Sequence, residues 1–534
     1  MENCRVLIER NNIMIDANCF LVGDIFLPQT NVALPTIVLR TPYGRNNIRA
    51  LFNPLEIVRN GFALLVQDVR GRGESSGVFD PFVNEADDGN KTIEWIRKQK
   101  WSNNQVYALG VSYEGYTAMM CNVNARIDGF ASIVSTKRIR ERWFFEGGKV
   151  KQAFVQAWAH SFAFTDKNRL SDKEKENVRK LADDLPNLYK LPLKEFPTAK
   201  YLPYYNSWIN KDNLLYWDEI EKSSDVNLGK SSGYYVSGWY DIFCEGTIED
   251  FKEAVSSSKQ PQKLVIGPWN HNDLYSSLVG AVDFGISTLM EIDPMDIISW
   301  FKKLSCSKSK VESEVVIYIM GMNQWKYFKN WPVDCDYLTL YLYSKESALS
   351  VNGDGYLSWE NALYEGSDNF CQKVNDFVPS LGGRCLHAST EQRKGGAYDQ
   401  RDIEKRSDVL IYTSDFLEKS ITILGLVKSQ IIVMADMEQA TIHMKVTDVG
   451  TQHSINVIDS CITVNKECYN QCVMMELGNI GYQFKRGHRI RIIISATAFP
   501  RISVDEFLYS SCCNVKIFWG KNTPSCIYLP QVNI

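Results

Sequence analysis

The stretch GVSYEGYTAM, residues 110–119, places Ser112 between two glycines and ahead of residues that form helices well. Such a serine is either an ordinary helix N-cap or a nucleophile on a sharp strand-to-helix turn, with its hydroxyl lifted clear for attack on a carbonyl carbon. The usual nucleophile pattern is Gly-x-Ser-x-Gly, whereas here Glu114 precedes Gly115 and the second glycine comes one residue late. The pattern at Ser112 therefore leaves both interpretations open.

A serine nucleophile needs a base that takes its proton, and the chain offers only six histidines. His271 follows the apolar run KLVIGPWN, a predicted strand that should break at Gly267 and Pro268, so His271 is expected in a loop at the carboxyl end of a strand. His160 lies on a predicted helical face and is expected to pack, and His443 falls on the polar phase of TIHMKVT and is expected to face solvent. Three other histidines lie in a Gly-rich loop, a turn and the start of a strand, and are expected to be structural: His387, His453 and His488.

Asp241 is the matching candidate for the carboxylate that orients the base. It follows GYYVSGWY, another predicted strand, and again stands just past the strand's end. Taken singly, Ser112, Asp241 and His271 each have a plain structural interpretation, as a cap, a turn residue and a satisfied polar group. Their order along the chain is that of an α/β-hydrolase triad, and the coincidence of all three favours catalysis.

Two glycine-rich stretches offer competing interpretations. GKSSG (229–233) fits the nucleophile pattern literally, but it precedes a strand and opens no helix. GRGESSG (71–77) resembles the start of a dinucleotide fingerprint, but the third glycine is missing at position 76. The fourteen cysteines are scattered and lack zinc-ligand spacing, so they are expected to be small buried side chains. We therefore expect no nucleotide, no metal and no other cofactor.

The elements around Ser112 predict a parallel α/β sheet. Apolar runs of strand length cover residues 33–41, 61–69 and 105–111, and the segment 84–99 has acidic residues near its start and basic ones near its end, which suits a helix. Alternation of strand and helix is typical of parallel sheets.

Composition bounds the class of protein. A chain of 534 residues with 45% hydrophobic content can bury the cores of two or three domains. The net charge of -4 is spread along the chain, so no nucleic-acid partner is expected, and no apolar run approaches the length of a membrane span. The first residues, MENCRVLIERNNIMID, carry charges where a signal peptide would be apolar, which predicts a cytoplasmic protein.

Five motifs in order resemble one family: RTPYGR (40–45), DVRGRGESSG (68–77), GVSYEG (110–115), SGWYD (237–241) and GPWNH (267–271). With them the chain resembles the cocaine esterase and X-prolyl dipeptidyl-peptidase group of α/β-hydrolases, which includes glutaryl acylases and α-amino acid ester hydrolases. The family's serine-tyrosine turn accounts for the displaced Gly115. The resemblance implies that the Tyr43 hydroxyl and the Tyr113 backbone N–H form the oxyanion hole.

The resemblance also implies the architecture. We expect an α/β-hydrolase domain over residues 1–137 and 229–330, a helical cap over 138–228, and a C-terminal jelly roll over 331–534, where alternating strands dominate the sequence. Aromatic residues of the cap and of the SGWYD and GPWNH motifs are candidates for the substrate pocket: Trp143, Phe144, Trp158, Trp239 and Trp269.

The expected function is that of a serine hydrolase, which cleaves an ester or amide of a small molecule or short peptide through an acyl-enzyme. X-prolyl peptidases of the family commonly carry an extra N-terminal domain, whereas strands start almost at residue 1 here, so an esterase or acylase is favoured over a peptidase. An acyltransferase and a catalytically silent binding protein remain alternatives, and a homo-oligomer is left open. Glu245, Glu146 and Asp218 are available should the substrate carry an ammonium group.

Overall fold

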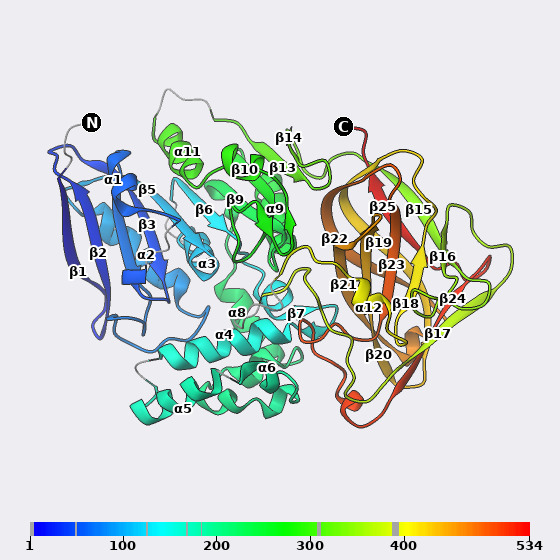
Figure 1. Ribbon diagram of the computed structural model, residues 1–534. Coiled ribbons are helices and arrows are strands. Elements are labelled where there is room, and N and C mark those ends of the chain that lie inside the picture. The colour runs from blue at the N-terminus through cyan, green and yellow to red at the C-terminus, as the bar shows by residue number, and fades with distance from the viewer. Residues whose placement is uncertain are drawn as a thin grey trace.

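The computed structural model describes residues 5–47, 51–123, 127–166, 169–182, 184–306, 311–386 and 395–534, so His387 lies outside the described residues. Figure 1 shows a sheet flanked by helices in the N-terminal half, a group of helices beneath it, and a β-rich C-terminal part beside both. The predicted fold class, an α/β-hydrolase with a cap and a C-terminal β domain, is confirmed.

A ten-stranded sheet carries the N-terminal half, in the order β1-β2-β4-β3-β5-β6-β9-β10-β13-β14. The strands from β4 to β13 run parallel, and β1, β2 and β14 pair antiparallel at the two edges. The central strands are buried on both faces, as their continuous apolar sequences predict. The strands are β1 (Val6–Asp16), β2 (Cys19–Pro28), β3 (Leu34–Thr41), β4 (Ala63–Asp68), β5 (Ser102–Val111), β6 (Gly129–Ile133), β9 (Ser232–Tyr240), β10 (Gln262–Asn270), β13 (Glu314–Ile319) and β14 (Gln324–Phe328).

Helices connect these strands and cover the sheet (Figure 1). The helix predicted over 84–99 is α2, whose first turn holds three carboxylates and whose last turn holds Arg97, so its charges complement the helix dipole. Helix α3 follows β5 directly, which confirms the strand-turn-helix context of Ser112. The helices of this domain are α1 (Pro54–Arg59), α2 (Glu85–Arg97), α3 (Tyr113–Met120), α9 (Cys244–Ser257), α10 (Ser287–Met290) and α11 (Met295–Ser305).

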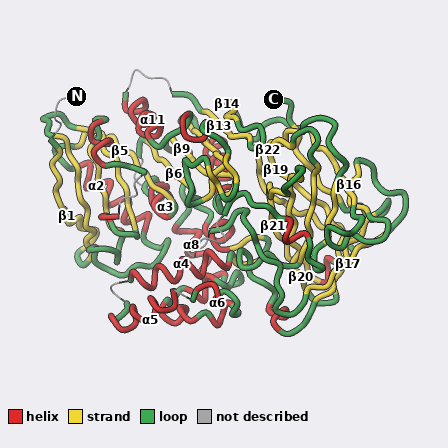
Figure 2. Tube along the Cα trace, in the orientation of Figure 1, coloured by secondary structure: helices red, strands yellow, loops and turns green. Residues whose placement is uncertain are grey.

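The segment between β6 and β9 is mostly helical, as Figure 2 shows by colour. Its longest helix, α4 (Gln152–Thr165), is apolar on nearly every side and almost wholly buried, because it lies between the other cap helices and the sheet domain. The same segment contains α5 (Asp172–Ala182), α6 (Leu185–Leu188), α7 (Tyr205–Trp208) and α8 (Leu214–Ser223), with the short strands β7 (Phe145–Glu146) and β8 (Lys149–Val150).

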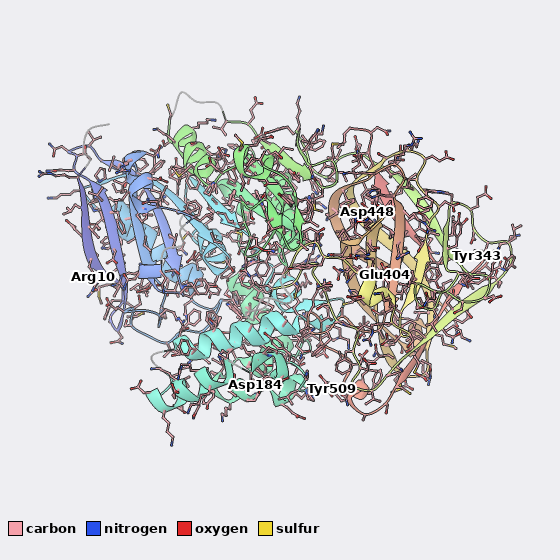
Figure 3. All side chains as sticks on the ribbon, viewed as in Figure 1. Arg10, Asp184, Tyr343, Glu404, Asp448 and Tyr509 are labelled. Atoms are coloured by element: carbon pink, nitrogen blue, oxygen red, sulfur yellow. The ribbon has the colours of Figure 1, made fainter. Side chains whose placement is uncertain are left out.

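The C-terminal part is a second large sheet system, in the order β17-β24-β19-β25-β15-β16-β18-β23-β20-β21, with β22 paired to β19. Glu404 and Asp448 lie within it (Figure 3), where Glu404 pairs with Arg491 and Asp448 accepts the Tyr482 hydroxyl. Its strands are β15 (Asp336–Tyr343), β16 (Tyr356–Ser358), β17 (Gly366–Gln372), β18 (Leu410–Thr413), β19 (Ile421–Ala435), β20 (Gln439–Val449), β21 (Ser454–Asn465), β22 (Cys472–Phe484), β23 (Arg489–Ser495), β24 (Cys513–Trp519) and β25 (Cys526–Gln531).

The prediction that His443 faces solvent is wrong. His443 lies in β20, which pairs with β21 and β23 and is buried on both faces, so the alternation of polar and apolar residues does not mark an exposed side. Its Nε2 lies 2.9 Å from Asp459 Oδ2. His160 packs as predicted, buried in α4 with Nδ1 3.3 Å from the Thr198 hydroxyl. Within the described ranges, every helix is too short or too polar to cross a bilayer.

Candidate active site

Ser112 occupies a strained turn between β5 and α3. Its backbone has φ 60° and ψ -125°, a conformation that L-residues rarely adopt. Its side chain makes no capping hydrogen bond to the helix, although Ser112 stands at the N-cap position. The plain capping interpretation of this serine therefore does not account for it, whereas strain of this kind is the signature of a nucleophile elbow.

The two glycines beside the turn are required by close packing. A Cβ on Gly110 would lie 2.2 Å from the backbone of Glu114, and a Cβ on Gly115 would lie 2.8 Å from the Ser135 Cβ. Both distances are too short for real atoms, so larger residues would push α3 away from β5 and β6. The glycine at position 115 thus serves the elbow despite its displacement from the usual pattern.

A continuous chain of hydrogen bonds joins Ser112, His271 and Asp241. The Ser112 Oγ lies 3.1 Å from His271 Nε2, and His271 Nδ1 lies 2.8 Å from Asp241 Oδ1. All three are buried, with exposed fractions of 6%, 5% and 0%. In this arrangement Nδ1 donates to the carboxylate and Nε2 is left to accept the serine proton.

Asp241 and His271 stand at the carboxyl ends of two neighbouring parallel strands, β9 and β10. Strand β10 continues to Asn270 instead of breaking at Gly267 and Pro268 as predicted, because the ladder with β9 resumes after an irregularity and pairs Asn270 with Tyr240. Asn270 then fixes the turn that follows. Its Oδ1 accepts the backbone N–H of Asn272 at 2.9 Å, and its Nδ2 donates to Gly395 O at 2.7 Å.

Sequence reasoning missed the residues that hold this constellation in place. Ser237 donates its hydroxyl to Asp241 Oδ2 at 2.8 Å, so the carboxylate oxygen that does not contact His271 also has a hydrogen-bond donor. Phe243 lies against the His271 ring, with centroids 5.4 Å apart. Lys151 donates to Ile242 O at 3.0 Å, and burial lowers its pKa to about 8. Ser237 stands in the SGWYD motif, but only the fold shows what it contacts.

Tyr43 lies in the loop after β3, where the carboxyl ends of the strands meet. Its backbone N–H donates to the Thr41 hydroxyl at 3.1 Å, and that hydroxyl donates to Glu114 Oε1 at 2.7 Å, so the Tyr43 loop is tied to the elbow. The Tyr43 ring stacks on Phe162 of α4. Tyr113 is the first residue of α3, a position whose backbone N–H has no partner within the helix.

The Tyr113 side chain is anchored in the core. Its hydroxyl donates to Glu85 Oε1 at 2.8 Å and accepts the Phe82 backbone N–H at 2.7 Å. Burial raises the pKa of Glu85 to about 7, although Arg40 opposes this shift. These contacts fix the residue whose N–H is the expected oxyanion donor.

Three of the five predicted pocket aromatics gather beside the elbow. Trp143 and Trp158 contact each other and the Tyr113 ring, and Phe144 contacts Trp158. Trp143 also packs on Phe243, which touches His271. All three aromatics are buried.

Trp239 and Trp269 belong to other clusters. Trp239 donates its ring N–H to Tyr318 O at 2.7 Å and packs against Trp331. Trp269 packs against Tyr275 and Trp325. Among the ring contacts of the described residues, none joins either tryptophan to the group beside the elbow.

The carboxylates that were candidates for holding a substrate ammonium are paired with other groups or exposed. Glu245 pairs with Arg384 at 2.7 Å and accepts the Asn479 backbone N–H, and Glu146 pairs with Arg501. Asp218 is exposed on α8. In the described part of the chain, no three His, Cys, Asp or Glu residues are grouped as metal ligands would be.

The sequence matches two family descriptions. Residues 18–273 match X-Pro dipeptidyl-peptidase (S15 family), and residues 308–464 match the X-Pro dipeptidyl-peptidase C-terminal non-catalytic domain. The first match spans Tyr43, Ser112, Asp241 and His271.

One sequence relative and two solved structures resemble the chain over nearly its whole length. Cocaine esterase of Rhodococcus sp. (strain MB1 Bresler) is 26% identical over 559 residues, with 96% of each chain covered. An aminopeptidase from a marine sediment Thaumarchaeota archaeon has the same fold, with TM-score 0.77 and 18% identity over 99% of this chain and 97% of that one. An α-amino acid ester hydrolase matches with TM-score 0.75 and 18% identity over the same shares. Through its matches over residues 18–273 and 308–464 the chain is related to the X-Pro dipeptidyl-peptidase (S15) family of α/β-hydrolases, with cocaine esterase among its homologues, and it is a serine hydrolase.

Proposed function

We propose that Ser112, His271 and Asp241 are the catalytic triad of an esterase that acts on small-molecule esters, with Tyr43 and the Tyr113 N–H as its oxyanion hole. The observation that carries the proposal is the unbroken chain from Ser112 Oγ through His271 to Asp241, with Ser112 on a strained elbow. A free serine hydroxyl is a weak nucleophile and needs a base to activate it. Ser112 is buried and has His271 within hydrogen-bond distance, as an activated serine requires.

The reaction follows from the geometry in two steps. His271 Nε2 takes the proton of Ser112 as Oγ attacks the ester carbonyl, and then gives that proton to the leaving alcohol as the acyl-enzyme forms. In the second step His271 takes a proton from water, the new hydroxide attacks the acyl carbon, and the proton returns to Ser112. Asp241 holds the Nδ1–H tautomer and stabilises the imidazolium that forms in each step.

In the proposed mechanism two donors stabilise the negative charge that develops on the carbonyl oxygen. The helix α3 presents the Tyr113 N–H at its first turn, where the helix dipole also favours an anion. Tyr43 would add its hydroxyl from the loop after β3. The loop is held to the elbow through Thr41 and Glu114, which keeps the two donors at a fixed position relative to each other.

An ester is favoured over a dipeptide as substrate. A peptidase that releases dipeptides needs an anchor for a free ammonium group, and the carboxylates Glu245 and Glu146 are each paired with an arginine. The extensive similarity to cocaine esterase also supports an ester substrate. For location we propose the cytoplasm, since the thirteen described cysteines are all free thiols, which suits a reducing compartment.

A burst experiment tests the acyl-enzyme route. Rapid mixing of the enzyme with 4-nitrophenyl acetate should release one equivalent of nitrophenol per active site before the steady state. Added hydroxylamine should divert the acyl group to the hydroxamate, and an alcohol acceptor that gives conjugate in preference to free acid would move the assignment to an acyltransferase. Hydrolysis with no burst and no diversion by any nucleophile would contradict the covalent mechanism.

A further inference from the structure

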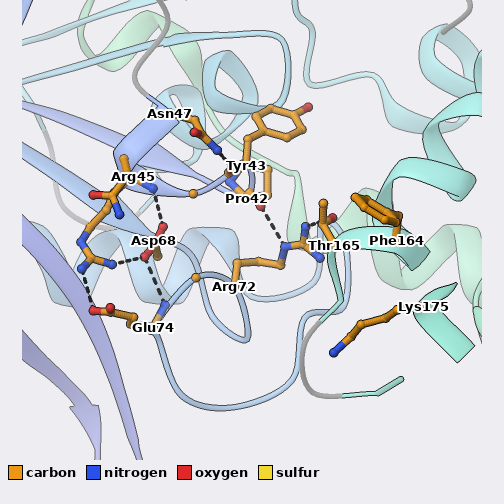
Figure 4. Close-up of a pocket in the computed structure, with 13 residues that line it drawn as sticks. Pro42, Tyr43, Arg45, Asn47, Asp68, Arg72, Glu74, Phe164, Thr165 and Lys175 are labelled. Carbon is orange, nitrogen blue, oxygen red and sulfur yellow. Dashed lines mark hydrogen bonds and ion pairs between the residues drawn. The ribbon is translucent and has the colours of Figure 1, made fainter. Parts of the chain in front are cut away.

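A cavity of about 520 Å³ opens beside Tyr43. Its walls come from the loops after β3 and β4 and from the carboxyl end of α4, with α5 at the rim (Figure 4). Its lining includes Pro42, Tyr43, Arg45, Arg72 and Phe164. The volume lies in the range of small-molecule sites.

Arg72 is an unusual member of this lining because its guanidinium is buried and, among the described residues, forms no ion pair with a carboxylate. The side chain is only 4% exposed. Its Nε donates to Pro42 O at 2.8 Å and its Nη2 donates to the Thr165 hydroxyl. The described part of the chain supplies no hydrogen-bond partner for Nη1 and no carboxylate oxygen within 4.0 Å of the guanidinium nitrogens. A buried cation with an unused donor is costly unless a ligand completes it.

The surroundings of Arg72 are aromatic. The guanidinium carbon lies 5.1 Å from the Phe79 ring centre and 5.3 Å from that of Phe162. These two rings hold the planar group in one orientation, so it is ordered before any ligand arrives. Phe162 also stacks on Tyr43, which places Arg72 one ring away from the proposed oxyanion donor.

The other charges of the cavity have their own partners. Arg45 on the facing wall pairs with Asp24, Asp68 and Glu74. At the rim, Lys175 lies 3.7 Å from Asp172. Figure 4 shows Arg45, Asp68 and Glu74 joined by dashed lines on one side and Arg72 with Thr165 on the other.

The groups that face Arg72 leave its charge under-compensated. Burial lowers the pKa of Arg72, and the nearby Asp166 carboxylate opposes this only in part. Asp166 itself is occupied by the Arg169 backbone N–H at 3.0 Å. An anion in the cavity would supply the negative charge that the described protein groups provide only in part.

We propose that Arg72 forms a subsite for a carboxylate of the substrate, so that the enzyme prefers esters or amides that carry a negative charge at the end lying beside Tyr43. The inference rests on the proposed function and adds the substrate class. A guanidinium with an unused Nη donor is well suited to a carboxylate oxygen. The same charge would repel a substrate ammonium, in agreement with the arginine-paired state of Glu245 and Glu146.

Matched ester pairs test the proposal on either side of the scissile bond. For the acyl side, 4-nitrophenyl hexanoate is compared with the 4-nitrophenyl half-ester of adipate. For the leaving group, 3-acetoxybenzamide is compared with 3-acetoxybenzoate. Wild type should show the higher kcat/KM for the anionic member of at least one pair, and Arg72→Met should lower that anionic-to-neutral ratio about tenfold or more.

Two controls accompany this variant. Arg72→Lys keeps the charge and should retain most of the preference. Lys173→Met removes an exposed charge on α5 that does not line the cavity, and it should leave the ratio within about twofold. If the anionic-to-neutral ratio of kcat/KM fell equally in Lys173→Met, the preference would come from the overall positive charge near the cavity, and the subsite would be overturned.

A measurement on wild type alone covers the case in which Arg72→Met fails to fold. Adipate should inhibit hydrolysis of the neutral hexanoate ester competitively, and adipamide of the same length should inhibit at least tenfold more weakly. Equal inhibition by the two compounds, or equal ratios in wild type and a folded Arg72→Met, would overturn the carboxylate subsite. If wild type did not hydrolyse the neutral esters at all, the proposed function would be overturned instead.

Discussion

The hydroxyl of Tyr113 donates to the buried carboxyl group of Glu85 at 2.8 Å, and this bond ties the residue after Ser112 to the start of helix α2. Glu85 Oε2 lies 3.4 Å from the Arg40 guanidinium, yet burial dominates and raises the pKa of Glu85 to about 7. The elbow is therefore held by a carboxyl group that loses its proton near neutral pH.

This relationship predicts a pH-dependent stability. Between pH 4.5 and 7 folded Glu85 keeps a proton that the unfolded chain has lost, so the free energy of unfolding should fall as the pH rises through this window, by about 3 kcal/mol in total. The glutamine in Glu85→Gln cannot titrate, so this variant should lack the pH-dependent fall in the free energy of unfolding. Urea unfolding of both proteins at pH 5, 6, 7 and 8 measures the difference, and Glu94→Gln, an exposed change on α2, controls for charge removal. Parallel profiles for wild type and Glu85→Gln would contradict the prediction.

Replacement of Tyr43 by Phe tests the oxyanion hole. Loss of one donor to the developing oxyanion is expected to lower kcat about 100-fold with little change in KM, because the hydrogen bond forms fully only in the transition state. Ester hydrolysis by the folded variant measures both constants. A kcat within about threefold of wild type would remove Tyr43 from the chemistry and leave it a packing residue against Phe162.

A second His-Asp pair of the chain supplies a matched control for the base. His488 Nδ1 lies 2.8 Å from Asp448 Oδ1, the same distance as between His271 and Asp241, but it belongs to the C-terminal domain. His271→Gln should lower kcat/KM at least about 10⁴-fold, whereas His488→Gln should leave it within about twofold. Equal losses in both variants would indicate damage to the fold, and no loss in His271→Gln would exclude it as the base.

Gly115→Ala tests the demand for a small residue at the displaced position. The new Cβ would lie 2.8 Å from the Ser135 Cβ, so α3 must shift. We expect the free energy of unfolding to fall by about 1–3 kcal/mol and kcat to fall with it, since the elbow carries Ser112. Chemical denaturation and ester hydrolysis measure the two effects. An unchanged stability would show that the elbow tolerates a side chain there.

The parts of the fold that can be predicted are those that depend on the pattern of neighbouring residues in the sequence. Short stretches of sequence predict the apolar strand before Ser112, the helix after it, and the strand that ends just before Asp241, because periodicity and glycine placement act within a few residues. The order of the motifs then indicated which residues should meet.

Other features depend on tertiary packing and were not predictable. His443 is buried because β20 has neighbours on both sides and layers on both faces, which alternation within one strand cannot reveal. Glu85 contacts Tyr113 only because α2 packs beside α3. Trp239 and Trp269 stand near Asp241 and His271 in sequence, but their rings pack toward Tyr318, Trp325 and Trp331.

The most direct test of the central claim is covalent labelling of Ser112 by a fluorophosphonate probe, with the adduct located by peptide mass. We predict one labelled serine in folded wild type, no label in Ser112→Ala, and greatly slowed labelling in His271→Gln. Folded wild type that takes up no probe, or a Ser112→Ala variant that takes it up equally well, would contradict the account and leave a binding protein that has kept the fold.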